Sequence, residues 1–143
     1  MVLFMFERCL YFNANAAVRE INRVWDRAYQ ALGLSPAHAY VLRLLLAKGG
    51  MPQRDIAAEL SLKKSTITRF VDALSMQDLV RRDYEQTNDR REQIIMPTAK
   101  AKHLHKQLDQ VGEQLFLQMQ KTIGAREIAA LVSALREVKN KFE

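Results

Sequence analysis

The sequence predicts a mainly α-helical fold with one small β-hairpin, and three observations lead to this class. Apolar residues recur at helical spacing over most of the 143 residues. Turn and cap signals such as Ser35-Pro36 and Gly49-Gly50 divide this pattern into segments of ordinary helix length. Two short runs, residues 79–84 and 92–96, have strand character and flank a single polar turn. With 48% hydrophobic residues, the chain can build a core.

The first predicted helix ends at Gly33, a stop signal just past its apolar pattern. Its apolar positions alternate in steps of four and three, which is the spacing of a heptad seam. The seam consists of Leu10, Ala14, Ala17, Ile21, Val24, Ala28 and Ala31. Such a seam needs a partner surface, so we expect another helix to cover it.

The second helix begins at Ser35, which we expect to be its N-cap, with Pro36 at the first helical position. This helix is apolar on most sides, which indicates that it is buried, through Val41, Leu42, Leu44, Leu45 and Leu46. Gly49-Gly50 ends it, and Pro52 opens the next helix.

Residues 53–70, QRDIAAELSLKKSTITRF, have the spacing of a helix-turn-helix. Ala57 is small where two helices must approach closely, and Ile67 and Phe70 face inward from the second helix. The outer face then carries Lys64, Ser65, Thr68, Arg69 and Asp72. Hydroxyl and guanidinium groups suit base edges in a DNA major groove. The alternative is an ordinary helical hairpin with a solvated polar face.

The predicted hairpin follows this second helix closely, and a β-wing beside such a helix makes a winged helix-turn-helix. The turn of the wing holds Asp89-Arg90-Arg91, and arginine at a wing tip can enter the minor groove. We expect Asp89 to structure the wing by pairing with Arg82 or Arg91. The predicted DNA-binding residues are Lys63, Lys64, Ser65, Thr66, Thr68, Arg69, Arg90 and Arg91. Lys63, Lys64 and the free amides at the helix start would contact phosphates.

Thr98 is the expected cap of a long helix, which Ile123-Gly124 separates from a final one. The apolar stripe of the final helix is Ile128, Leu131, Val132, Leu135, Val138 and Phe142. We therefore predict a winged DNA-binding domain at 34–97, with 1–33 and 98–143 as a helical dimerisation region. A two-fold homodimer would bury the terminal stripes. The alternative is a monomer whose end helices cover the centre.

Charge indicates where an anionic partner would bind. The formal charge is +6, and residues 63–106 hold 10 basic against 6 acidic side chains. This excess favours nucleic acid or an acidic membrane. The apolar start, residues 1–6, lacks the length of a signal or membrane-spanning segment, so we expect a soluble, cytoplasmic protein without a membrane partner.

The sequence supports neither an enzyme nor a metal centre. It has no Gly-rich phosphate loop and no HExxH motif, so we expect no catalytic residues and no cofactor. His103 and His105 point to different faces of a predicted helix, so we assign no metal site. Cys9 is the single cysteine, which excludes an intrachain disulfide.

Together these motifs resemble the MarR family of bacterial transcriptional regulators. The resemblance covers Leu32 to Ser35, the helix-turn-helix from Ile56 to Leu74, Leu79 to Arg82, the Asp89-Arg90-Arg91 signature and Thr98 to Ala101. It implies a triangular homodimer whose winged domains bind a pseudo-palindromic operator on double-stranded DNA, with repression as the default outcome. Asp78 stands where the family usually has glycine, so we expect a strained or rearranged turn there.

The resemblance also implies an effector, often an aromatic acid, that enters a cleft and releases DNA. Residues that could line such a cleft for an aromatic or anionic ligand are Arg8, Tyr11, Trp25, His38 and Tyr40. The alternative is that these are ordinary side chains at a helix interface.

Two alternative functions stay open. One is a thiol-based peroxide-sensing repressor acting through Cys9, because a hydroperoxide-sensing branch of the family has a reactive cysteine near this position. Cys9 lies about two residues too early for that branch, so a structural cysteine is the preferred interpretation. The other is a helical interaction protein that binds no DNA, which explains the charge but not the wing.

Overall fold

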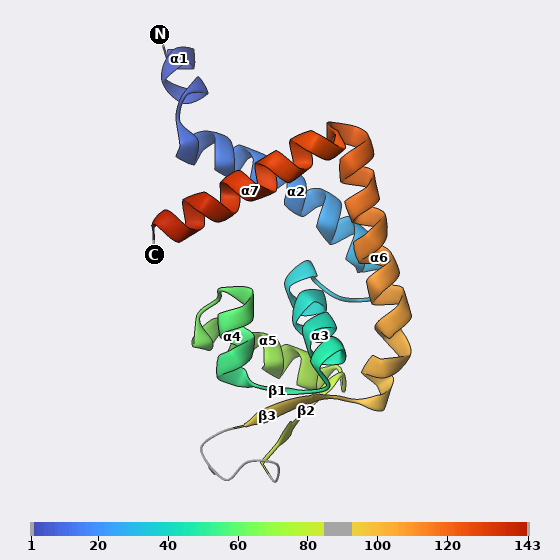
Figure 1. Cartoon of the computed structure of the whole chain (residues 1–143). Helices are drawn as coiled ribbons and strands as arrows, with labels where there is room; N and C mark the ends of the chain where they lie inside the picture. Colours follow the sequence, from blue (N-terminus) through green and yellow to red (C-terminus); the bar gives the residue numbers. More distant parts are fainter. Residues whose placement is uncertain (1, 85–92, 143) are drawn as a thin grey trace. The chain divides into compact units, whose positions relative to one another are not determined.

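The computed structural model describes residues 2–84 and 93–142, and the chain divides into two compact units, Met1–Leu108 and Asp109–Glu143. The elements of the first unit are α1 (Val2–Glu7), α2 (Leu10–Gln30), α3 (Pro36–Lys48), β1 (Met51–Pro52), α4 (Gln53–Leu60), α5 (Lys64–Met76), β2 (Val80–Asp83) and β3 (Ile94–Pro97) (Figure 1). Helix α6 (Ala99–Ile123) continues from the first unit into the second, which ends with α7 (Ala125–Lys141).

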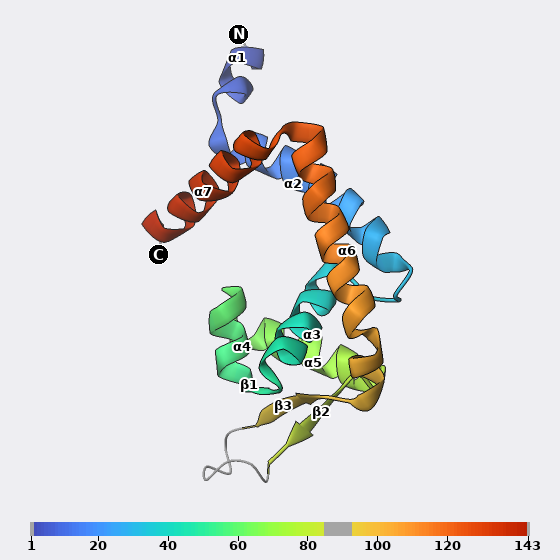
Figure 2. The ribbon, with the colours of Figure 1, turned by 45° about the vertical axis from the view of Figure 1, so that its right-hand side comes forward.

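The small sheet has three strands rather than the two that the sequence predicts. Strands β2 and β3 form the expected antiparallel hairpin, with Val80 opposite Pro97 and Asp83 opposite Ile94. Strand β1 adds to the other edge of β3, with Met51 opposite Ile95, so the order is β1-β3-β2. A two-residue strand has no alternating pattern to detect, and its strand pairing depends on β3. In both views β2 and β3 project past α3, α4 and α5 (Figures 1 and 2).

Three predicted helix boundaries are confirmed by their caps. The Ser35 hydroxyl accepts a hydrogen bond from the His38 amide at 3.2 Å, and Pro36 is the first residue of α3. Gly49 ends α3 in the left-handed conformation, with φ of 80°. The Thr98 hydroxyl accepts from the Ala101 amide at 3.2 Å and donates to the Asp78 carbonyl at 2.7 Å. Thr98 therefore starts α6 and also joins it to the turn before the wing.

The core of the first unit fixes the orientation of α5. Ile67, Val71 and Leu74 on its inner face are fully buried. The other large buried side chains of this unit are Tyr29, Val41, Leu42, Leu45, Ile56, Leu79, Ile95 and Leu108. Because α5 buries one face completely, its opposite face is fixed relative to the rest of the winged domain.

Both helices of the helix-turn-helix end in a left-handed residue that is not glycine. Ser61 follows α4 with φ of 54°, and Asp78 follows α5 with φ of 59°. In each turn the backbone amide after the left-handed residue donates a hydrogen bond to a carbonyl of the preceding helix. The Leu62 amide donates to the Ala57 carbonyl at 2.9 Å, and the Leu79 amide donates to the Leu74 carbonyl at 3.0 Å. Residues other than glycine rarely adopt this backbone conformation, so the expected strain at Asp78 is present.

The second unit leaves its apolar stripe exposed. Within the described residues, α7 has no buried residue, and both Leu131 and Leu135 are about half exposed. The large exposed hydrophobic residues of this unit are Phe116, Leu117, Ile123, Leu131, Val132, Leu135 and Phe142. None of the described helices combines the length and the apolar character that crossing a bilayer requires.

Candidate DNA-binding surface

The outer face of α5 is polar and accessible, as the sequence predicts. The side chains of Lys64, Ser65, Thr68, Arg69 and Asp72 are exposed, whereas Thr66 is half-buried. Exposed residues at spacings of three and four share one side of a helix, so Ser65, Thr68 and Asp72 form a row. The hydroxyl and carboxylate groups of that row, with the Arg69 guanidinium beside it, can read base edges.

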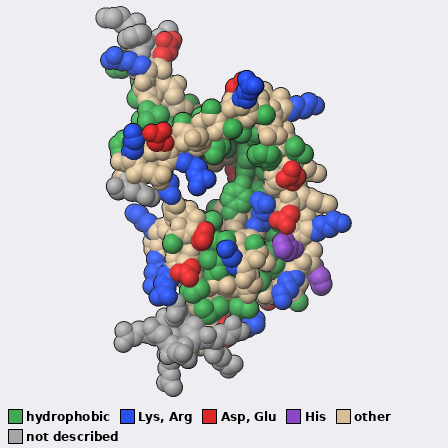
Figure 3. Space-filling view, in the orientation of Figure 1, with side chains coloured by type: hydrophobic (Ala, Val, Ile, Leu, Met, Phe, Trp, Pro, Cys, Tyr) green, Lys and Arg blue, Asp and Glu red, His purple; other side chains and the backbone are tan. Residues whose placement is uncertain are grey.

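The first turn of α5 concentrates positive charge. Lys63 is the N-cap residue, and its side chain makes no capping hydrogen bond. The amides of the first turn therefore keep their donors for an anion, at the positive end of the helix dipole. Lys63 and Lys64 are both exposed at this end. Figure 3 shows Lys and Arg side chains gathered beside the turn between α4 and α5. This end of the helix can hold a phosphate group.

An ion pair joins the wing to α5. The Arg82 guanidinium on β2 binds the Asp72 carboxylate on α5. From the sequence we expect Asp89 to pair with Arg82 or Arg91, and in the structure Arg82 pairs with Asp72. Asp89, Arg90 and Arg91 lie outside the described residues. This ion pair joins the first wing strand to α5.

The base of the wing carries further polar links. The side-chain amide of Gln93 donates to the Tyr84 hydroxyl at 3.0 Å, and this bond joins the two sides of the hairpin. The Arg81 guanidinium lies 3.4 Å from the Asp83 carboxylate on the same strand. The Gln53 backbone amide donates to the Gln93 carbonyl at 3.3 Å, so the start of α4 contacts the start of the second wing strand.

Thr68 has two hydrogen-bond partners that its sequence pattern does not predict. Its hydroxyl donates to the Lys64 carbonyl at 3.0 Å, one helical turn back. It also accepts from the side-chain amide of Gln53 at 2.5 Å. Gln53 was missed as a site residue, because no local pattern pairs two residues fifteen positions apart.

The structure brings together two of the five predicted cleft residues. The Trp25 indole N–H donates to the Tyr40 hydroxyl at 2.8 Å, which links α2 to α3. Two residues that sequence analysis missed complete this aromatic cluster. The Tyr29 ring meets the Tyr40 ring edge-on at 6.0 Å, and the Arg43 guanidinium lies 5.8 Å from the centroid of Tyr40.

Tyr29 is the buried member of this cluster. Its side chain is fully buried, and its hydroxyl makes no hydrogen bond of normal geometry within the described residues. Burial, with the neighbouring Tyr40 phenol, raises the pKa of Tyr29 above its ordinary value. The phenol therefore stays neutral and keeps its proton for donation.

The other three predicted cleft residues lie elsewhere. The His38 ring packs edge-on against Phe70 of α5, with centroids 5.0 Å apart, and burial lowers the pKa of His38. Tyr11 is on the first turn of α2, about 21 Å along the helix from Trp25 at 1.5 Å per residue. Arg8 precedes α2. One chain therefore does not gather all five residues into a single cleft.

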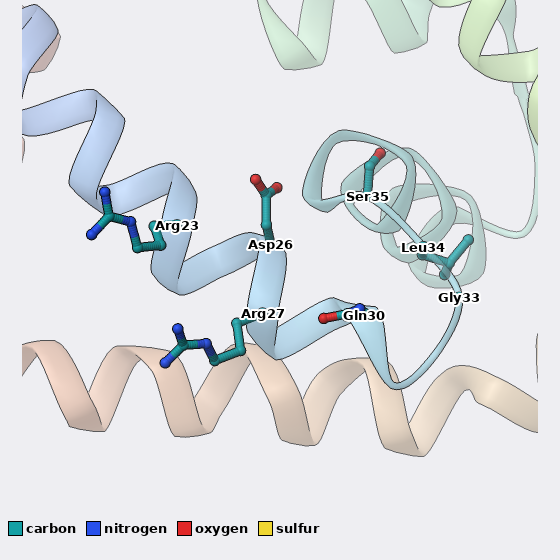
Figure 4. Close-up of a pocket in the computed structure, with 7 residues that line it drawn as sticks. All are labelled: Arg23, Asp26, Arg27, Gln30, Gly33, Leu34 and Ser35. Carbon is teal, nitrogen blue, oxygen red and sulfur yellow. The ribbon is translucent and has the colours of Figure 1, made fainter.

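An open depression lies at the end of α2 (Figure 4). Its volume is about 470 Å³, and its lining is Arg23, Asp26, Arg27, Gln30, Gly33, Leu34 and Ser35. Arg23 also lies 3.3 Å from Glu20, and the Ser35 hydroxyl already caps α3. Two of the seven lining side chains are therefore already engaged in local structure.

Cys9 is the N-cap residue of α2. Its sulfur accepts a hydrogen bond from the Phe12 amide at 3.5 Å, as the N-cap of α2. The side-chain amide of Asn13 donates to the Phe6 carbonyl at 2.7 Å and to the Cys9 carbonyl at 2.8 Å. These bonds hold the connection between α1 and α2. No group of three or more metal-ligating side chains is placed to bind an ion within residues 2–84 and 93–142.

Comparison with known proteins identifies the winged region. The model of the MarR family matches residues 34–93. No curated protein sequence matches the chain significantly.

Solved structures match nearly the whole chain. MarR from E. coli in complex with operator DNA has a TM-score of 0.79 and 23% identity, over 90% of this chain and 92% of that one. MepR from S. aureus in complex with DNA has a TM-score of 0.83 and 16% identity, over 94% and 99%. BpsR from Bordetella bronchiseptica has a TM-score of 0.83 and 18% identity, over 94% of this chain and 95% of that one, and its DNA binding is regulated by 6-hydroxynicotinic acid. At these identities the likeness establishes the winged-helix fold.

Proposed function

We propose that the chain, whose residues 34–93 match the model of the MarR family, is a sequence-specific DNA-binding transcriptional repressor. One observation carries the proposal: α5 presents an exposed row of polar side chains directly beside a basic, uncapped helix start. Base-reading groups and phosphate-binding groups therefore lie on one element, as DNA recognition requires.

We propose that the protein acts as a homodimer on a pseudo-palindromic operator. The exposed stripe of α7 supports this, because an amphipathic helix with no buried residue needs a partner surface. The exposed apolar side chains of α1 and α2, which include Met5, Leu10 and Phe12, support it as well. Two winged domains in such a dimer would reach successive major grooves about 34 Å apart.

Selection of bound DNA tests the DNA-binding proposal. The purified protein is incubated with a randomised duplex library, and the recovered sequence is compared with a scrambled duplex of equal length and composition in a mobility-shift assay. We expect a two-fold symmetric motif and at least about 10³-fold tighter binding to it than to the scrambled duplex. Equal affinity for the two duplexes would contradict the proposal, because phosphate contacts alone give such a result.

A second proposal concerns regulation: the aromatic cluster of Trp25, Tyr29 and Tyr40 with Arg43 binds an aromatic acid. Stacking rings, a buried phenol that keeps its proton and a guanidinium are the groups that such a ligand requires. The relative BpsR, which responds to 6-hydroxynicotinic acid, supports this class of effector.

Trp25 is the only tryptophan of the chain, so its fluorescence reports directly on this cluster. We expect hydroxylated benzoic or nicotinic acids to change that fluorescence and to weaken operator binding over the same concentration range. Tyr29→Phe keeps the ring but removes the buried hydroxyl, and it should weaken both responses together. DNA release with no change in Trp25 fluorescence would place the effector elsewhere.

A further inference from the structure

We propose that Gln53, at the start of α4, is a positioning residue that determines base preference through Thr68. Its side-chain amide holds the Thr68 hydroxyl in one orientation. Thr68 then offers a base a hydrogen-bond acceptor and a methyl group, but no hydrogen-bond donor. The inference rests on the proposed DNA-binding function. It adds a residue outside the exposed row of α5 to the specificity of that row.

The geometry fixes the direction of both hydrogen bonds on Thr68. The Lys64 carbonyl, 3.0 Å from the Thr68 oxygen, can only accept, so the single hydroxyl proton points to it. The second neighbour, 2.5 Å away, must then donate, and it is the Nε2 group of Gln53. The two contacts together leave Thr68 with one lone pair and its methyl group.

Gln53 is itself held from a second side. Its backbone amide donates to the Gln93 carbonyl at 3.3 Å, next to the second wing strand. Gln53 therefore touches α5 through its side chain and the wing through its backbone. A side chain anchored in this way can keep Thr68 in one state at each encounter with DNA.

The fixed hydroxyl makes a chemical prediction about the base that faces it. Adenine N6 and cytosine N4 are donors in the major groove, and thymine presents a methyl group, so each of these bases suits Thr68. Guanine presents two acceptors there, which a hydroxyl with no proton left cannot satisfy. The base facing Thr68 is therefore adenine, cytosine or thymine, and guanine is selected against.

The experiment is base-resolved selection from a randomised duplex library with the full-length protein and a set of variants. Gln53→Met removes the donor at similar side-chain length, and Thr68→Val removes the hydroxyl but keeps the methyl group. Gln53→Lys keeps a donor at this position and serves as the conservative replacement. Gln107→Met makes the same change at an exposed glutamine of α6 and is the matched control.

We expect Gln53→Met to reduce the discrimination against guanine about threefold to tenfold at one base of each half-site. Gln53→Lys should restore that discrimination, and Gln107→Met should leave it unchanged. In the Thr68→Val background, Gln53→Met should have no further effect, because the two residues act through one hydroxyl.

Three outcomes would overturn the inference: an unchanged motif for Gln53→Met, an equal loss of preference at every position, or a full effect of Gln53→Met in the Thr68→Val background. An equal loss at every position would show that Gln53 supports binding as a whole and does not determine the preference at one base. Failure of the proposed function looks different, because the wild-type protein would then select no motif at all.

Discussion

Helices α5 and α7 are both amphipathic, but α5 buries its apolar face and α7 leaves its apolar face exposed. Helix α5 buries Ile67, Val71 and Leu74 completely inside the first unit and exposes a polar row. Helix α7 buries no residue, although Leu131 and Leu135 lie on one apolar stripe. The winged domain thus completes its core within one chain, whereas the C-terminal helix requires another surface. Disruption of the two helices should therefore affect different properties.

The largest effect is expected from a charge on the stripe of α7. Leu131→Asp combined with Leu135→Asp should prevent association, because two buried carboxylates would lose their hydration without a partner. The monomer should bind operator DNA about 10²–10⁴-fold more weakly, since it loses simultaneous contact with two half-sites. Light scattering gives the oligomeric state, and a mobility shift gives the affinity.

Ser133→Asp is the control for this pair, because it adds a charge to α7 away from the stripe. It should leave both the mass in solution and the affinity near those of the wild type. A dimer that survives the double substitution would show that the stripe of α7 is not the interface.

The next effect concerns the two kinds of contact on α5. Arg69→Ala should weaken operator binding by about 1–3 kcal/mol and relax base preference, because arginine reads guanine directly. Lys63→Ala should weaken binding to all duplexes alike and flatten its dependence on salt. Titrations of operator and scrambled duplexes over a series of salt concentrations separate the two effects. An equal loss of discrimination in both variants would contradict this division of roles.

A smaller effect follows from the turns that close the helices. The turn after α2 contains Gly33 with φ of 69°, whereas the turn after α5 contains Asp78 with a similar left-handed φ of 59°. Asp78→Gly should therefore raise the free energy of unfolding by about 0.5–1 kcal/mol, since glycine adopts this conformation without strain. Chemical denaturation measures the change, and Asp78→Ala is the control that should bring no gain. A stability below that of the wild type for Asp78→Gly would show that the Asp78 side chain contributes more than the strain costs.

The smallest effect is a pH dependence from His38, which packs against Phe70 of α5. Burial holds the pKa of His38 below its ordinary value of 6.5, so the unfolded chain binds this proton more readily than the folded protein does. The contribution to the free energy of unfolding is complete above pH 6.5 and falls as the pH drops through the lower folded-state pKa. Denaturation at a series of pH values should show a shallower acid slope for His38→Gln. His103→Gln, at an exposed position of α6, should keep the wild-type slope.

Local signals allowed much of the fold to be predicted. The Ser35 cap, the left-handed Gly49 and the Thr98 cap each depend on residues within one turn of the chain. The exposed row of α5 follows from helical periodicity alone. Strand β1 could not be predicted in this way, because two residues become a strand only when another strand lies beside them.

The exposed face of the candidate site could be predicted from the sequence, but the hydrogen bonds and the ion pair that hold it could not. Periodicity places Thr68 on the outside of α5, yet it says nothing of the bond from Gln53. The Arg82 side chain was expected to serve the wing, but its partner Asp72 lies ten residues earlier on another element. Trp25 and Tyr40 were grouped by residue type, and their direct bond depends on how α2 and α3 pack. Each missing link joins separate elements, so it is set by tertiary packing.

The links between α5 and the wing also affect how the protein finds its site. The Asp72–Arg82 pair and the two bonds of Gln53 join these elements before any DNA is present. The conformational entropy of alignment is then lost once, when the chain folds, rather than at each collision with a chromosome. A protein of this kind can slide along non-specific duplex on its lysines and test each register without refolding. Its search time should therefore depend more on ionic strength than on conformational change.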